Sequence, residues 1–215
     1  MKQYIFFPIL SVFGIVSCQP KTAENQSQTP VEERAVGGLC ECCEAWSEGL
    51  PDVVKWETNL ASEAEPGIPI RVSGTIYTQD GRTPAANVLL YVYHTDDTGL
   101  YSDGSKLSDC TRRHGHLRGW MKTDVQGQYA FRTIRPAAYP NSRIPAHIHA
   151  IIKEPGLKNY WIADYFFDDD PFLSEKDKQD TLARGGNGVL QMEKNEPGIW
   201  EGKRDIVLGK HVPGY

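Results

Sequence analysis

The sequence predicts an all-β protein, folded as an antiparallel β-sandwich with little helix. Three observations support this prediction: short runs of alternating apolar and polar residues recur along the chain, turn-forming residues separate them, and helical periodicity is scarce. Hydrophobic residues make up 40% of the 215 residues, a proportion typical of globular proteins. We therefore expect one folded domain, over residues 37–215.

The first predicted strand spans residues 70–76, where every second residue is apolar or glycine. An Asp-Gly pair at residues 80–81 predicts a turn, and the apolar run at residues 88–93 predicts a buried strand. Further strands are predicted at residues 127–132, 147–152, 162–167 and 204–208. The best helix candidate covers residues 174–183, with Ser174 as its N-cap.

The N-terminus indicates export. Lys2 precedes an apolar run at residues 4–16 that is too short to span a membrane, so residues 1–17 are predicted to be a signal peptide. The segment ends in Ile-Val-Ser-Cys18, which resembles a bacterial lipoprotein cleavage box; a plain signal peptide with a chance cysteine is the alternative. We expect acyl chains on Cys18 to anchor the protein to a membrane of the cell envelope, on its periplasmic or outer face. Residues 18–36 are polar and predict a disordered tether.

Four cysteines remain once Cys18 is set aside. Cys40, Cys42 and Cys43 form a tight cluster, and Cys110 lies far along the chain. An even number in an exported protein favours disulfides, with Cys110 paired to one member of the cluster. A zinc or copper knuckle is the alternative, although the sequence lacks the paired CxxC spacings of such sites.

The charge argues against nucleic acid as a partner. The formal net charge is -5 and becomes -6 once the signal peptide, with its single charge on Lys2, is removed. The sequence also has no basic stripe that would follow a phosphate backbone.

Two histidines and two tyrosines predict a metal site. His147 and His149 alternate on a predicted strand, so both project to the same side, about 6 to 7 Å apart. Tyr139 precedes this pair and Tyr101 lies further upstream. A phenol with a pKa near ~10 binds as phenolate only to a strongly Lewis-acidic cation, which favours ferric iron over zinc. Considered singly, each tyrosine is more often a half-buried structural residue, and an isolated HxH is often a surface pair.

Residues 70–173 resemble the intradiol ring-cleaving dioxygenases, a family that includes catechol and protocatechuate dioxygenases. The matching motifs are Val72–Ile76 with Asp80-Gly81, Val92–Tyr101, Arg118–Asp124, Gly127–Ile134, Pro136–Pro140, Pro145–His149 and Tyr165-Phe166 with Asp170-Pro171. The resemblance implies a non-haem ferric centre, Fe(3+), ligated by Tyr101, Tyr139, His147 and His149. It also implies that a catechol-like substrate and O2 react to give a muconate-type diacid, with Tyr139 acting as the base and Tyr101 remaining a ligand. A homo-oligomer is compatible with the resemblance.

The residues expected around the substrate depart from the family pattern. Ile144 stands where family members commonly have an arginine, with Arg143 as its neighbour, and Ala163 replaces a frequent glutamine. A one-residue shift on an extended segment reverses the side chain, so the role of Arg143 in the substrate shell stays open. His114 and His116 form a second alternating pair, which we interpret as facing solvent or substrate rather than metal because arginines flank it.

Two other functions fit part of the sequence. Residues 70–139 alone also resemble Ig-like accessory modules of surface lipoproteins, which bind or space without catalysis. Such modules do not explain the HxH pair or Tyr101. A copper-binding sandwich that uses both HxH pairs leaves the tyrosines unexplained.

Overall fold

The computed structural model describes residues 1, 3, 32–102, 108–195 and 198–215. Apart from Met1 and Gln3, the predicted signal peptide lies outside the described residues, as do Cys18 and most of the predicted tether. Among the described residues, no helix combines the length and apolar character needed to cross a membrane.

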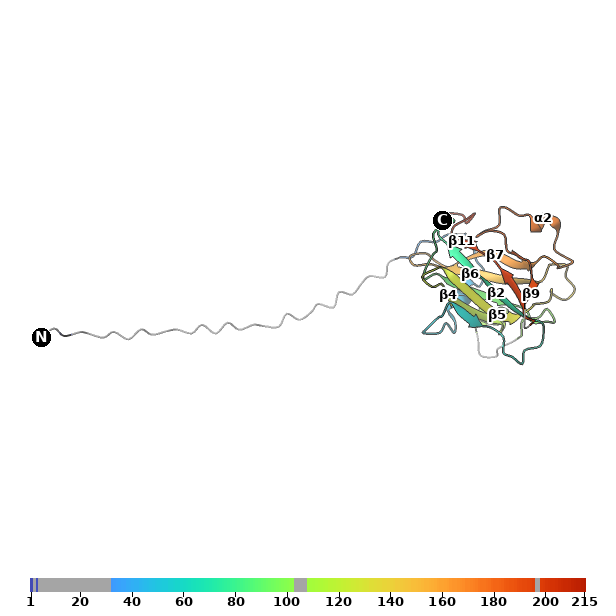
Figure 1. Ribbon diagram of the computed structural model, residues 1–215, viewed down its shortest axis with the longest axis horizontal. Coiled ribbons are helices and arrows are strands. Elements are labelled where there is room, and N and C mark those ends of the chain that lie inside the picture. Colours follow the sequence, from blue (N-terminus) through green and yellow to red (C-terminus); the bar gives the residue numbers. More distant parts are fainter. Residues whose placement is uncertain (2, 4–31, 103–107, 196–197) are drawn as a thin grey trace. The chain divides into compact units, whose positions relative to one another are not determined.

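The folded unit, Glu32–Tyr215, contains two β-sheets (Figure 1). The first sheet has the order β1-β5-β2-β10-β9, with β11 also paired to β2. Its strands are β1 (Glu57–Asn59), β2 (Pro69–Tyr77), β5 (Gln128–Ile134), β9 (Glu193–Lys194), β10 (Trp200–Lys203) and β11 (Ile206–Val207). The second sheet has the order β4-β3-β6-β7-β8. Its strands are β3 (Leu89–His94), β4 (Arg118–Lys122), β6 (His147–Lys153), β7 (Tyr160–Phe167) and β8 (Val189–Leu190).

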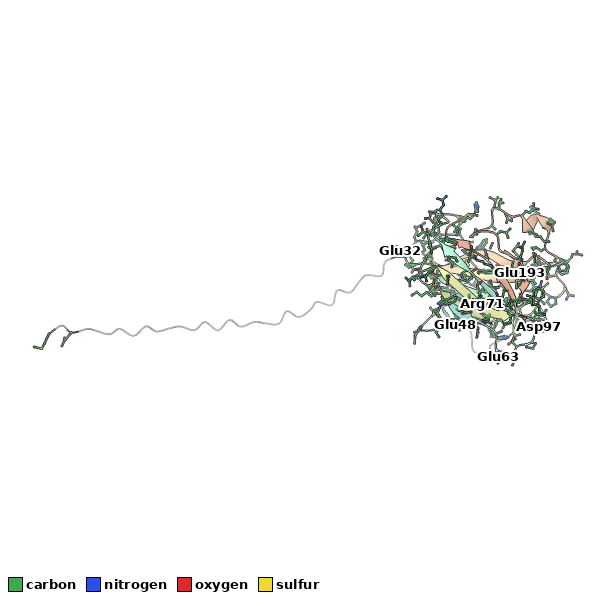
Figure 2. The ribbon with its side chains drawn as sticks, viewed as in Figure 1. Glu32, Glu48, Glu63, Arg71, Asp97 and Glu193 are labelled. Atoms are coloured by element: carbon green, nitrogen blue, oxygen red, sulfur yellow. A yellow bond between two sulfur atoms is a disulfide. The ribbon has the colours of Figure 1, made fainter. Side chains whose placement is uncertain are left out.

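One hydrophobic core joins side chains from the two sheets. Val72 and Phe131 from the first sheet belong to the same buried cluster as Val92, Ile148 and Ile162 from the second. Alternation along each strand places these residues inward and leaves their neighbours on the outer faces. The exposed acidic residues, among them Glu63, Asp97 and Glu193, lie on the surface (Figure 2).

The prediction of a two-sheet, all-β fold with little helix is confirmed. The central pairs are antiparallel, whereas β1·β5, β2·β10, β2·β11 and β7·β8 are parallel. The strand predicted at residues 204–208 is shorter, because only Ile206 and Val207 pair with β2. The short member of each parallel pair is β1, β8, β10 or β11. Each is two to four residues long, which is too short to show a clear alternating pattern in the sequence.

Two short helices and a 3-10 helix lie outside the sheets. They are α1 (Asp109–Arg113), α2 (Glu175–Lys178) and η1 (Cys43–Ser47). Ser174 caps α2 as predicted, with Asp177 completing a capping box. The predicted helix at 174–183 nevertheless ends at Lys178. The Asn187 side-chain amide donates to the Lys178 carbonyl, in place of the backbone amide that would continue the helix.

The tether ends earlier than predicted. Arg34 forms a β-bridge with Leu157, and Val36 is buried in the core. Residues 32–36 therefore belong to the folded unit, since these contacts supply the burial that a polar segment lacks by itself.

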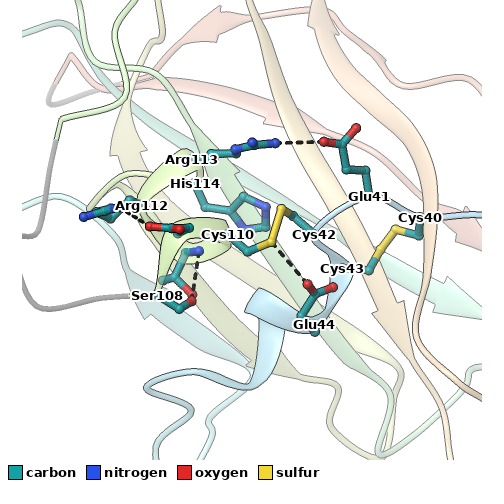
Figure 3. Close-up of a disulfide and its surroundings, with 12 residues drawn as sticks. Cys40, Glu41, Cys42, Cys43, Glu44, Ser108, Cys110, Arg112, Arg113 and His114 are labelled. Atoms are coloured by element: carbon teal, nitrogen blue, oxygen red, sulfur yellow. Dashed lines mark hydrogen bonds and ion pairs between the residues drawn. A yellow bond between two sulfur atoms is a disulfide. The ribbon is translucent and has the colours of Figure 1, made fainter.

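The segment before β1 contains one disulfide and is joined to α1 by a second (Figure 3). Cys40 is bonded to Cys43, and Cys42 is bonded to Cys110 in α1. Cys43 packs with Tyr91 and Ile151 on the outer face of the second sheet. This segment, residues 37–48, therefore covers part of the same face that carries the two histidines of β6.

Candidate metal centre

The two histidines of β6 project from the outer face of the second sheet. Ile148 between them is fully buried in the core, which follows from the alternation of a strand. The Nε2 atoms of His147 and His149 lie 3.2 Å apart.

Two tyrosines reach this pair from separate loops. Tyr101 lies in the loop after β3, and Tyr139 lies in the loop between β5 and β6. The Tyr139 hydroxyl is 2.8 Å from the Tyr101 hydroxyl, 3.1 Å from His147 Nε2 and 3.4 Å from His149 Nε2. We call these four side chains the four-donor cluster.

Backbone contacts hold the two tyrosine loops together. Gly99 adopts a positive φ of 81° and lies so close to the Ala138 carbonyl that a Cβ would collide with it. The Thr95 hydroxyl donates to the Ala137 carbonyl at 2.8 Å, and the Ala137 amide donates to the Asp96 carbonyl. The register of these contacts determines where both phenols point.

The geometry of the four-donor cluster fits one metal ion. Ligands about 2.0–2.1 Å from an ion lie about 2.9–3.4 Å from their neighbours in octahedral or tetrahedral arrangements. The four contacts that link these donors, 2.8 to 3.4 Å long, lie within or close to that range. Two phenol oxygens and two imidazole nitrogens form a donor set suited to a hard, strongly Lewis-acidic cation.

Both imidazoles are oriented by a contact to the other ring nitrogen. His147 Nδ1 donates to the Pro145 carbonyl at 2.7 Å, and His149 Nδ1 donates to Asp164 Oδ1 at 3.0 Å. Each Nε2 therefore keeps its lone pair and faces the cluster, as a metal ligand must.

Burial sets the protonation of the cluster. It raises the pKa of Tyr101 and of Tyr139 and lowers the pKa of His147. The hydrogen bond with Tyr139, in which the Tyr101 hydroxyl is the donor, adds to the rise in the pKa of Tyr101. At neutral pH both phenols are protonated and His147 is neutral, so a bound cation must displace the phenolic protons.

The two members of the second histidine pair, His114 and His116, have different surroundings. His114 is buried, its ring stacks on Tyr93 at 3.6 Å between centroids, and burial lowers its pKa to about 4. His116 is more exposed and pairs with Glu65 at 3.0 Å. The Tyr93 ring also stacks on His149, 4.6 Å between centroids, so His114 supports the metal centre through Tyr93.

The other residues predicted around the substrate lie as follows. Arg143 places its guanidinium over the Phe172 ring, 5.5 Å from the centroid, and Ile144 is 51% exposed. A cavity of about 340 Å³ borders His149 and is lined on other sides by Trp161, Asp164 and residues 39–41. This volume accommodates a single aromatic ring.

The cysteines do not form a metal knuckle in this structure. Cys42, Cys110 and Glu44 lie together, but the Cys42–Cys110 disulfide occupies both thiolates that would bind a metal ion (Figure 3).

Asp164 is the residue of the site that the sequence analysis missed. By simple alternation from Tyr160 and Ile162 its carboxylate would point into the core. That conflict between a charge and a core position is a signal of a β-bulge, and the structure has one there.

Comparisons with known proteins agree with the fold. A protein-family model described as "Dioxygenase" matches residues 46–196. Catechol 1,2-dioxygenase 2 of Acinetobacter lwoffii is 29% identical over 130 residues, covering 53% of this chain and 45% of that relative. The protocatechuate 3,4-dioxygenase beta chain of Burkholderia cepacia is 30% identical over 123 residues, covering 54% of this chain and 52% of that relative. The chain thus spans about half the length of these relatives.

A solved structure extends the likeness to three dimensions. The 3-chlorocatechol 1,2-dioxygenase of Rhodococcus opacus 1CP superimposes with a TM-score of 0.56 at 26% identity, over 75% of this chain and 68% of that one.

Proposed function

This chain belongs to the family of intradiol ring-cleaving dioxygenases, and on that basis we propose that it opens a catechol-type ring with O2 to give a muconate-type diacid. The contacts of 2.8 to 3.4 Å that join Tyr139 to Tyr101 and to both histidines, and the histidines to each other, carry this proposal. Tyr101, Tyr139, His147 and His149 are the proposed ligands of one ferric ion.

The tyrosines favour ferric iron over zinc or copper. Two half-buried phenols with raised pKa values ionise only beside a strongly Lewis-acidic cation, and their oxygens are hard donors that stabilise a trivalent ion. When bound, ferric iron supplies the Lewis acidity that holds the catechol as its dianion and makes the ring reactive towards O2.

Tyr139 is the proposed proton acceptor for the incoming catechol. His147 and His149 are fixed in a strand that is paired on both sides, and each ring is pinned at Nδ1. Tyr139 instead lies in a loop, and among the described residues its hydroxyl has hydrogen-bond partners only within the four-donor cluster. Its oxygen can therefore leave the donor set and take one catechol proton while the histidines stay in place.

The overall reaction balances without an added reductant. Catechol and O2 have together the atoms of the diacid, since both oxygen atoms enter the product between the hydroxyl-bearing carbons as the carbon–carbon bond breaks. The protein's own task is to bind the ring, orient it and accept its protons.

We also propose that the protein works outside the cytoplasm, attached by acyl chains on Cys18. Two disulfides in the folded unit support export, because such bonds persist in oxidising compartments.

The test is the visible spectrum of the iron-loaded protein, before and after catechol is added under air. We expect a tyrosinate-to-iron charge-transfer band that shifts with catechol, followed by a diacid that incorporates both atoms of labelled O2. A His147→Ala/His149→Ala variant, loaded in the same way, is the control and should stay colourless. A colourless wild-type protein that retains no iron would reject the ferric site, and a coloured protein that leaves catechol intact would reject the activity.

A further inference from the structure

We propose that Asp164 is a positioning residue that holds the His149 imidazole with its Nε2 atom turned towards the four-donor cluster and strengthens it as a metal ligand. This inference rests on the proposed function of the site. It assigns a role to a side chain that lies outside the donor set.

A β-bulge brings Asp164 to the histidine. Ile148 pairs with Tyr165 and Ala150 pairs with Ile162, so two residues of β7, Ala163 and Asp164, lie opposite the single residue His149. The extra residue reverses the alternation, and Asp164 joins the outer face instead of the core. Its Oδ1 atom lies 3.0 Å from His149 Nδ1.

The core of the protein holds this bulge in place. The buried side chain of Arg204 donates from Nη1 to the Ala163 carbonyl at 2.7 Å, and the Ala163 amide donates to the Arg184 carbonyl at 3.0 Å. Gly188 lies against the Asp164 carbonyl, where any Cβ would collide with it. The position of the carboxylate is thus set by backbone contacts from two other segments.

The contact makes Asp164 a partner of the ligand and not a ligand itself. Oδ1 meets Nδ1, the ring nitrogen on the side away from Tyr139, while Nε2 faces the Tyr139 hydroxyl at 3.4 Å. A carboxylate on the remote nitrogen fixes the tautomer and raises the electron density that the imidazole offers to a metal. His147 has only a neutral carbonyl at the same place, so the two histidines are unequal donors.

The first experiment compares iron retention and the visible spectrum of Asp164→Ala and Asp164→Asn with those of the wild type. We expect Asp164→Ala to bind ferric iron about 10- to 100-fold more weakly and to shift the charge-transfer band. Asp164→Asn, which keeps an acceptor and loses the charge, should fall between the two. Glu65→Gln is the matched control, because it removes the carboxylate of the Glu65–His116 pair, which lies outside the cluster, and it should match the wild type. Equal iron affinity in Asp164→Ala and the wild type, with an unchanged band, would overturn the inference.

The second experiment needs no metal and separates the failure of this inference from failure of the proposed function. In the metal-free protein, nitrogen-15 NMR of the histidine rings should show His149 with its proton on Nδ1, and Asp164→Ala should lose that preference. Glu65→Gln should change only the His116 signals. A His149 proton on Nε2 in the wild type, or an unchanged tautomer in Asp164→Ala, would contradict the positioning role. A wild type that binds no iron yet shows the expected tautomer would refute the ferric site and leave the Asp164 contact standing.

Discussion

The Tyr139 hydroxyl has three neighbours inside the four-donor cluster, the Tyr101 hydroxyl and the Nε2 atoms of His147 and His149. No other phenol of the described residues combines these contacts. A substitution of Tyr139 is therefore the most direct single-residue test of the site.

Tyr139→Phe should lower the rate of ring opening by at least about 100-fold, the contribution typical of a positioned proton acceptor. The visible band of the iron-loaded variant should weaken as well, because one of two phenolate donors is gone. Tyr77→Phe removes a hydroxyl outside the cluster and serves as the control. Full activity and colour in Tyr139→Phe would show that Tyr139 is not a ligand.

His94 should make the stability of the fold depend on pH. Its side chain is buried, Nδ1 donates to the Thr95 carbonyl, Nε2 accepts from the Thr133 hydroxyl, and burial lowers its pKa to about 4. In the unfolded chain the His94 imidazole has its ordinary pKa of ~6.5. Between that value and the lower pKa of the folded state, the unfolded chain binds a proton at His94 and the folded protein does not. The free energy of unfolding should therefore fall as pH drops from about 6.5 to about 4.

Urea unfolding over that pH range provides the measurement. His94→Gln should show a shallower decline than the wild type, although His114, whose pKa burial also lowers to about 4, keeps part of it. Identical slopes in the two proteins would exclude His94 as a source of the pH dependence.

At the scale of elements, the pairing of β6 with β7 couples the core to the metal centre. β6 supplies both histidines, and the bulge in β7 supplies the carboxylate behind one of them. The segment of residues 37–48 lies on the same outer face and is joined to α1 by Cys42–Cys110. His114 caps the C-terminal end of α1 and stacks on Tyr93, which contacts His149 in turn.

The two disulfides should contribute unequally to stability. Cys42–Cys110 closes a loop between cysteines with a sequence separation of 68. Cys40–Cys43 closes a loop between cysteines with a sequence separation of only 3. The chain-entropy estimate is about 4 kcal/mol for the long loop and about 2 kcal/mol for the short one. Cys42→Ser/Cys110→Ser should therefore lower the denaturant midpoint more than Cys40→Ser/Cys43→Ser. The reverse order would show that the effect does not come from loop closure.

At the scale of the whole molecule, the proposed lipid anchor on Cys18 can be tested directly. The full chain, expressed in a bacterium fed a labelled fatty acid, should carry the label and sediment with membranes. Cys18→Ser should lose both properties, whereas Cys40→Ser, which keeps Cys18, should retain the label. A wild-type protein without the fatty-acid label would contradict the proposed acylation of Cys18 and favour a plain signal peptide.

Much of the site was accessible from the sequence because its parts are local. The HxH spacing places two imidazoles on one side of any strand, and the tyrosines sit in motifs with glycine and proline around them. The long alternating runs also predicted β2, β3, β5, β6 and β7. The strands that were not predicted are β1, β4, β8, β9 and β10. All but β4 are two to four residues long, too short to show a pattern without their partners.

The sequence by itself determined the fold class, because alternation and turn residues act over a few positions, and its resemblance to the family singled out the four residues proposed as donors. Only the tertiary structure decided the role of Asp164, which depends on a bulge held by Arg204 and Gly188 from later in the chain. It alone decided the cysteine pairing and the inclusion of residues 32–36 in the fold as well. These features arise from contacts between segments that are distant in the sequence. The free energy of such contacts depends on both segments and on how the fold brings them together.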